Sequence, residues 1–89
     1  MILTINCGSS SLKYQLHAPD LSHVIASGLI ARIGEPEGTT DHWVGHRGEH
    51  HRREIPDHRA AFALMMENLL NPEYDVIECP GAITAMVNY

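Results

Sequence analysis

A short segment near the N-terminus, residues 6–13, sets the strictest limit on the fold, because a glycine and three serines here separate two strand-like runs. Residues 2–5 are rich in β-branched side chains, and residues 12–17 alternate apolar with polar positions. Small polar residues between two such runs are typical of a tight turn. We therefore expect residues 1–17 to form a β-hairpin whose second strand has one buried side and one solvent-facing side.

The same segment carries groups that can bind an anion. Lys13 provides a mobile positive charge, and the carboxamide of Asn6 stands at the end of the first strand, where it can hold a phosphate or a metal-bound water. An ordinary hairpin turn contains the same kinds of residue, but the combination with Lys13 predicts a phosphate-binding turn. Its backbone N–H groups and hydroxyls come from Gly8, Ser9, Ser10 and Ser11.

Two common enzyme motifs do not fit this segment. A Walker A loop needs Gly directly before its Lys and Ser or Thr directly after it, and Leu12 and Tyr14 occupy those places. A P-loop NTPase is therefore excluded. The sequence does not indicate a Ser-His-Asp triad either. His17, the histidine closest in sequence to the serines, is expected on the solvent-facing side of its strand without an acidic partner.

Composition narrows the range of partners. A chain of 89 residues is long enough for one domain. Its 6 basic and 11 acidic side chains give a net charge of −5, which disfavours a general binder of nucleic acids or membrane surfaces, because such proteins present a basic face. Small anions or another protein are the expected partners.

The cysteines and the apolar runs indicate the compartment. Cys7 and Cys79 form neither a CxxC pair nor the dense pattern of a disulfide scaffold, so both are expected to be free thiols. The sequence shows no signal-peptide pattern and no apolar run of membrane-spanning length. These features predict a cytoplasmic protein.

Two further β elements are expected after the first hairpin. Residues 24–33 form a third strand, which completes a three-stranded antiparallel meander. Residues 39–54 are polar and rich in histidine, and we expect an exposed hairpin there with its turn at Arg47 and Gly48.

One amphipathic helix is expected over residues 57–71, where Asp57 can cap the N-terminus and Pro72 ends the helix. Such a helix is stable when its apolar stripe is covered, so we expect it to pack against the meander. Residues 82–87 then begin a further strand. The stripe follows the helical period at Phe62, Met65, Met66, Leu69 and Leu70.

The histidines of the polar hairpin raise a separate hypothesis, a zinc or nickel site. His46 and His50 would align on a helix, but Gly45 and Gly48 disfavour a helix there and the neighbouring arginines would repel a cation. A solvated hairpin of mixed charge is the simpler interpretation, and a metal carrier ranks last. The other histidines near this pair are His42, His51 and His58.

Three stretches of the chain resemble the acetate kinase family. Residues 4–16, with Asn-Cys-Gly-Ser-Ser-Ser-Leu-Lys-Tyr at their centre, are similar to the N-terminal signature of that family. Residues 26–34 resemble its G-L-x-x-R-I-G strand, and residues 56–61 resemble its D-H-x-x-A helix start. The resemblance implies an α/β chain that forms the N-terminal part of a ribonuclease-H-like domain, as in actin and sugar kinases. In that fold an antiparallel meander continues through a helix into parallel strands.

The resemblance also implies a function, the transfer of a phosphoryl group between ATP and acetate to give ADP and acetyl phosphate. On this basis Asn6 would help to place Mg²⁺, and Lys13 would approach the phosphates of ATP or ADP. The complete enzyme is expected to be a cytoplasmic homodimer. Its phosphate site would be lined by Gly8, Ser9, Ser10 and Ser11.

The chain is nevertheless expected to be catalytically incomplete. Where the family continues into G-H-R-V-V-H-G-G, whose arginine contacts the carboxylate or acyl-phosphate substrate, this sequence has residues 85–89 and ends. We therefore expect the 89-residue chain alone to turn over little or no substrate. Two alternatives stay open. One is a fragment of a propionate or butyrate kinase, and the other is a non-catalytic interaction module derived from the same fold.

Overall fold

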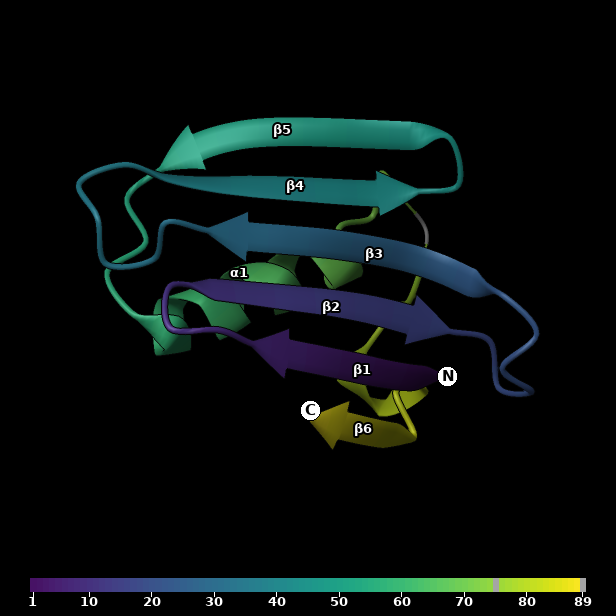
Figure 1. Ribbon diagram of the computed structural model, residues 1–89. Helices are drawn as coiled ribbons and strands as arrows, with labels where there is room; N and C mark the ends of the chain where they lie inside the picture. Colours follow the sequence, from purple (N-terminus) through teal and green to yellow (C-terminus); the bar gives the residue numbers. More distant parts are fainter. Residues whose placement is uncertain (75, 89) are drawn as a thin grey trace.

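A mixed six-stranded sheet with one α-helix on one of its faces makes up most of the residues that the computed structural model describes, 1–74 and 76–88 (Figure 1). Helix α1 spans His58–Leu70, and a short 3-10 helix, η1, spans Pro80–Ala82. The strand order across the sheet is β5-β4-β3-β2-β1-β6. The strands are β1 (Ile2–Cys7), β2 (Ser11–His17), β3 (Val24–Ala31), β4 (Gly38–Val44), β5 (Arg47–Arg53) and β6 (Ala85–Asn88).

The first five strands form one continuous antiparallel meander, and β6 then pairs in parallel with β1. The predicted three-stranded meander and the predicted polar hairpin are therefore parts of a single sheet. The order of elements, with a helix between the meander and a parallel strand, is confirmed. The chain passes beneath the sheet through α1 before it reaches β6 (Figure 1).

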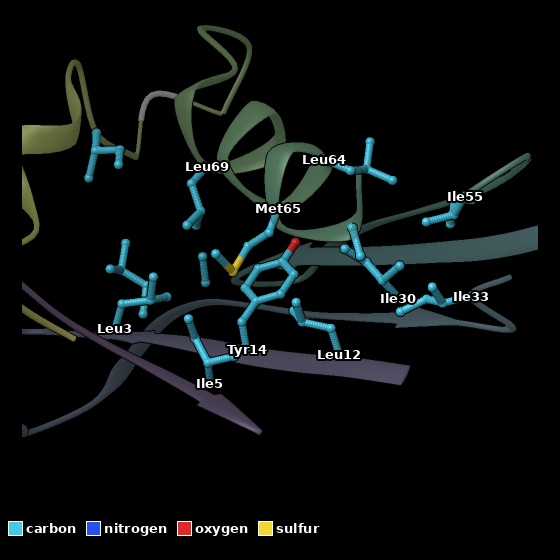
Figure 2. Close-up of a cluster of buried hydrophobic side chains, with 14 residues drawn as sticks. Leu3, Ile5, Leu12, Tyr14, Ile30, Ile33, Ile55, Leu64, Met65 and Leu69 are labelled. Atoms are coloured by element: carbon cyan, nitrogen blue, oxygen red, sulfur yellow. The ribbon is translucent and has the colours of Figure 1, made fainter. Parts of the chain in front are cut away.

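Figure 2 shows the core, which lies between the sheet and α1. Alternate residues of β1 and β2 are buried, as expected for strands with one covered face. Each large apolar side chain buried in this layer contributes roughly 1.5–3 kcal/mol, and together they hold α1 against the sheet. The core residues include Leu3, Ile5, Leu12, Tyr14, Leu16, Ala26 and Ile30 from the strands, Ala61, Leu64, Met65 and Leu69 from α1, and Ile33, Ile55 and Ile77 from the connecting segments.

The face that α1 buries differs from the predicted stripe. Phe62 is 39% exposed, and Met66 and Leu70 are only partly buried. The buried face is rotated toward Ala61 and Leu64 instead. Ala61 is fully buried in this face, whereas Phe62, the next residue along the helix, lies at its margin.

The turn between β4 and β5 lies one dipeptide earlier than predicted. The loop consists of Gly45 and His46, and both Arg47 and Gly48 belong to β5. Gly45 has a φ of +61°, the left-handed conformation that favours glycine in tight hairpins. Gly48 has a different role, because a Cβ at this position would lie 2.6 Å from the ring of Trp43.

Two other predictions about these strands need correction. β3 ends at Ala31 and does not continue to residue 33, because Arg32 has a φ of +58° and leaves the extended conformation. The predicted exposed hairpin is exposed along the whole of β5 but only in part along β4. Thr40 and His42 of β4 are buried on the side of the sheet that α1 covers.

Both cysteines are free thiols at exposed positions, as predicted. Within residues 1–74 and 76–88, no helix combines the length and the apolar character needed to cross a membrane.

Candidate functional site

The predicted phosphate-binding turn joins β1 to β2 through three exposed residues, Gly8, Ser9 and Ser10. The Gly8 N–H donates to the Ser11 carbonyl at 2.9 Å, so this amide is engaged within the turn. The N–H groups of Ser9 and Ser10 have no acceptor among the described residues. A Cβ on Gly8 would lie 2.7 Å from Ser11 Oγ, a side-chain atom that could move aside by rotation.

Two other segments hold this turn in place. The Ile33 N–H donates to the Ser10 carbonyl at 2.9 Å. His58 Nε2 lies 2.9 Å from the Gly8 carbonyl oxygen. Figure 1 shows the β1–β2 turn, the end of β3 and the start of α1 at the same end of the sheet. The three stretches that resemble one family in the sequence therefore meet in space.

Asn6 and Lys13 are paired directly opposite each other across β1 and β2. Opposite residues of an antiparallel pair project from the same face, with Cβ atoms about 4.5–5.5 Å apart. Both residues are exposed, whereas Ile5 and Leu12 beside them are buried against α1. Asn6 and Lys13 therefore lie on the face of the sheet that α1 does not cover, and Ser11 shares that face by strand alternation.

The positive charge of Lys13 is not neutralised by a salt bridge among the described residues. Asp41, which is two strands away in the same cross-strand row, is bonded to His50 Nδ1 at 2.6 Å. Arg32, which follows β3, is paired with Glu35 at 3.3 Å. The Lys13 ammonium is therefore the cation of this face that is free to meet an anion close to the turn.

The described residues contain no group of three His, Cys, Asp or Glu side chains placed to hold a metal ion. The histidines of the polar hairpin are dispersed, since His42 is buried and His50 and His51 alternate along β5. Near the turn, the Asn6 carboxamide is one exposed oxygen donor. Mg²⁺ keeps most of its waters and often uses few protein ligands beside substrate phosphates. Asn6 therefore suits an ion that arrives with a nucleotide.

A second polar cluster lies inside the core, between β4 and α1. Tyr14 Oη is 2.6 Å from His42 Nδ1, and Asn68 Nδ2 donates to Tyr14 Oη at 3.3 Å and to Thr40 Oγ1 at 3.4 Å. Tyr14 Oη therefore takes part in two hydrogen bonds, one with Asn68 of α1 and one with the His42 ring of β4. Burial lowers the pKa of His42 and raises the pKa of Tyr14, so both are uncharged at neutral pH. This cluster ties β4 to α1.

His58 is absent from the predicted site residues. The histidine closest in sequence to the serines, His17, contacts Thr4 Oγ1 at 3.1 Å instead. His58 is separated from Gly8 by 50 positions, so no local pattern links the two. The available signal is that residues 56–61 form one of the three stretches with a family resemblance.

Comparisons with known proteins agree with these features. The sequence profile of the Acetokinase family matches residues 1–86. The chain is 49% identical over 69 residues to the acetate kinase of Clavibacter michiganensis subsp. michiganensis, a match that covers 75% of this chain and 17% of that enzyme. It is 48% identical over 79 residues to the acetate kinase of Desulfitobacterium hafniense, which covers 86% of this chain and 20% of that enzyme.

Solved structures show the same arrangement. The crystal structure of Porphyromonas gingivalis acetate kinase matches with a TM-score of 0.91 and 26% identity, over 98% of this chain and 22% of that one. A propionate kinase from Francisella tularensis shares the fold, with a TM-score of 0.79 and 24% identity over 98% of this chain and 21% of that one. The chain thus spans about a fifth of the length of the relatives it matches. Because the family profile covers nearly all of its residues, the chain belongs to the acetokinase family.

Proposed function

We propose that this chain provides the phosphate-binding turn of a kinase that transfers a phosphoryl group between ATP and acetate, giving ADP and acetyl phosphate. The observation that carries the proposal is the grouping of Asn6, Ser11 and Lys13 on one solvent-facing side of the β1–β2 turn. Ser9 and Ser10 are exposed at the tip of that turn. The meander, α1 and β6 are, on this proposal, the opening elements of a ribonuclease-H-like domain.

Phosphoryl transfer depends mainly on positioning and on neutralising charge, and these residues can do both. The Lys13 ammonium neutralises phosphate oxygens of ATP or ADP, while the free N–H groups and hydroxyls of Ser9 and Ser10 donate hydrogen bonds to them. The Asn6 carboxamide binds a phosphate oxygen or a water of Mg²⁺. Mg²⁺ bound with the nucleotide would offset the charge of the phosphates. Gly8 shapes the turn but offers no donor to the anion, since its N–H is already bonded to the Ser11 carbonyl.

The proposal assigns phosphate binding to this chain, and not the complete reaction, because the chain spans about a fifth of the length of its relatives. Binding of the acid is assigned to the other four-fifths of such an enzyme. Acetate is preferred among short-chain acids because the two curated relatives described above are acetate kinases.

Replacing Lys13 by Ala is expected to weaken the binding of MgADP by about tenfold or more, because a charge-assisted hydrogen bond to phosphate is lost. Isothermal titration calorimetry of the 89-residue chain measures the Kd, and the amide resonances of Ser9 and Ser10 report where MgADP binds. Arg52→Ala is the matched control. It also removes one positive charge, but from an exposed position on β5, where Arg52 pairs with Glu37 at 3.7 Å.

The proposal fails if Lys13→Ala and the wild type bind MgADP equally well. It also fails if MgADP leaves the Ser9 and Ser10 resonances of the wild type unchanged. An equal loss of affinity in Arg52→Ala would mean that net charge, and not the turn, governs binding.

A second candidate function, a non-catalytic interaction module, is supported by one observation. β6 is the outer strand of the sheet among the described residues, and its Met86 and Val87 are 50% and 45% exposed. An unpaired edge with apolar side chains favours association with another protein strand. This function is favoured if Lys13→Ala leaves nucleotide binding unchanged while the chain stays bound to itself or to a partner.

A further inference from the structure

His58 links the start of α1 to the proposed phosphate-binding turn. It is the first residue of α1, directly after Asp57, whose side chain accepts the Ala60 N–H at 2.8 Å and caps the helix. The imidazole Nε2 of His58 lies 2.9 Å from the Gly8 carbonyl oxygen. Because a carbonyl oxygen can only accept, Nε2 carries the proton and donates it.

This hydrogen bond fixes the orientation of one peptide plane. Peptide units are planar and trans, so the Ser9 N–H points away from the Gly8 carbonyl of the same unit. The Gly8 carbonyl is directed at His58 on α1, and the Ser9 N–H is therefore directed away from α1. The side chains of Asn6 and Lys13 project on that same side of the sheet.

Backbone hydrogen bonds hold the rest of the turn, whereas the carbonyl of the Gly8–Ser9 peptide is bonded to His58. The Ser10 carbonyl accepts the Ile33 N–H at 2.9 Å, and the Ile55 carbonyl accepts the Gly34 N–H at 2.8 Å. The segment that follows β3 is thus attached both to the turn and to the segment that leads into α1. The pairing of β1 with β2 does not depend on His58.

We propose that His58 is a positioning residue for phosphate binding, which keeps the Ser9 N–H directed toward the anion that Lys13 meets. The inference rests on the proposed function, and it extends a site built from β1 and β2 to a side chain of α1. His58 itself does not touch the phosphate. It acts through the peptide between Gly8 and Ser9.

Two substitutions separate the hydrogen bond from the bulk of the side chain. His58→Leu keeps much of the volume but has no donor, whereas His58→Gln keeps an N–H donor at the end of its side chain. His58→Leu is expected to weaken MgADP binding by the 89-residue chain about three- to tenfold, the usual value of one hydrogen bond. His58→Gln is expected to bind within about twofold of the wild type. His23→Leu, in the exposed segment between β2 and β3, is the matched control and should bind like the wild type.

A spectroscopic readout tests the hydrogen bond without any ligand. The ¹⁵N shift of the Ser9 amide should move in His58→Leu and return toward the wild-type value in His58→Gln. The imidazole ¹⁵N spectrum of the wild type should show a proton on Nε2 of His58. A spectrum with the proton on Nδ1 alone would overturn the inference, even if His58→Leu did not fold.

The binding data distinguish this inference from the proposed function. If the wild type binds MgADP and His58→Leu binds it equally well, the inference is wrong and the proposed function stands. Equal weakening in His58→Leu and His58→Gln would also overturn the inference, because the donor would then not matter. If the wild type binds no MgADP, both the proposed function and the inference are wrong.

Discussion

Tyr14, Gly28 and His42 form a row across three strands, in which one small residue makes a buried hydrogen bond possible. A Cβ on Gly28 would lie 2.2 Å from the Tyr14 ring, so the ring can cross β3 only over a glycine. Tyr14 Oη thereby reaches His42 Nδ1 at 2.6 Å on the next strand. His42 Nε2 is buried without a hydrogen-bond partner among the described residues, which makes any added charge on this ring costly.

This row predicts a loss of stability in acid. Burial lowers the pKa of His42 below its ordinary value of 6.5, although the Glu49 carboxylate partly opposes that effect. The folded protein therefore keeps His42 neutral at a pH where the unfolded chain binds a proton. The stability that comes from keeping His42 neutral is fully present above pH 6.5. It is lost as the pH falls from 6.5 through the lowered pKa of His42 in the folded state. The loss is at most about 1.4 kcal/mol per pH unit. Urea unfolding at about pH 7.5 and about pH 5 measures it.

The variant His42→Asn isolates this effect, because Asn keeps a polar atom for Tyr14 but does not titrate. We expect the free energy of unfolding of His42→Asn to depend less on pH than that of the wild type. His46→Asn, at the exposed turn between β4 and β5, is the control and should retain the wild-type dependence. Equal pH dependence in the wild type and in His42→Asn would contradict the expectation.

At the scale of elements, α1 shows how contact with the sheet selects the buried face of a helix. Met65 is fully buried, whereas Phe62, one turn earlier, is 39% exposed. We expect Met65→Ala to lower the free energy of unfolding by about 2–4 kcal/mol, which is typical of a buried methionine. Phe62→Ala should cost less than about 1 kcal/mol, although phenylalanine is the larger side chain. Urea unfolding compares the two variants, and an equal or larger cost for Phe62→Ala would favour the predicted stripe over the observed face.

The elements themselves can be predicted because their causes are local. Alternation of apolar and polar residues marks β1 and β2, and the Asp57 cap together with Pro72 marks the limits of α1. The residues of the proposed site, from Asn6 to Lys13, are also close in sequence, because they lie on both sides of one tight turn.

The features that differ from prediction depend on contacts between distant residues. In the sequence, Gly48 predicts a turn. In the structure it lies within β5, where a Cβ would collide with the Trp43 ring. Ala61 has a small side chain and contributes little to a predicted apolar stripe, yet it is fully buried in the face that α1 turns to the core. His58 reaches the turn from 50 positions away. None of these contacts leaves a periodic signal in the sequence.

At the scale of the whole molecule, the two edges of the sheet differ in chemistry. β5 is exposed and carries three arginines, and charged side chains protect a strand edge from pairing. β6 is attached on its inner side through pairing with β1, and the segment that precedes it, residues 82–84, is hydrogen-bonded to Met1. The Met1 ammonium donates to the Ala82 carbonyl at 3.0 Å, and the Thr84 N–H donates to the Met1 carbonyl at 2.9 Å. The outer side of β6 has no neighbouring strand among the described residues (Figure 1).

We therefore expect the 89-residue chain to self-associate through β6, because an unpaired strand with apolar side chains is a template for a second strand. The net charge of −5 opposes association at low salt, and screening should make association stronger as salt is raised. Sedimentation velocity over a range of protein and salt concentrations measures the degree of association. Val87→Lys places a charge on the open edge and should shift the chain toward the monomer.

The control His46→Lys adds a similar charge at the turn beside β5, on the opposite edge of the sheet, and should leave association unchanged. Reduced association in both variants would assign the effect to net charge and not to β6. A wild type that stays monomeric at every concentration and salt level would show that the exposed Met86 and Val87 do not suffice to recruit a second strand. In that case the open edge would not support the interaction-module function, and phosphate binding at the β1–β2 turn would be the function left to test.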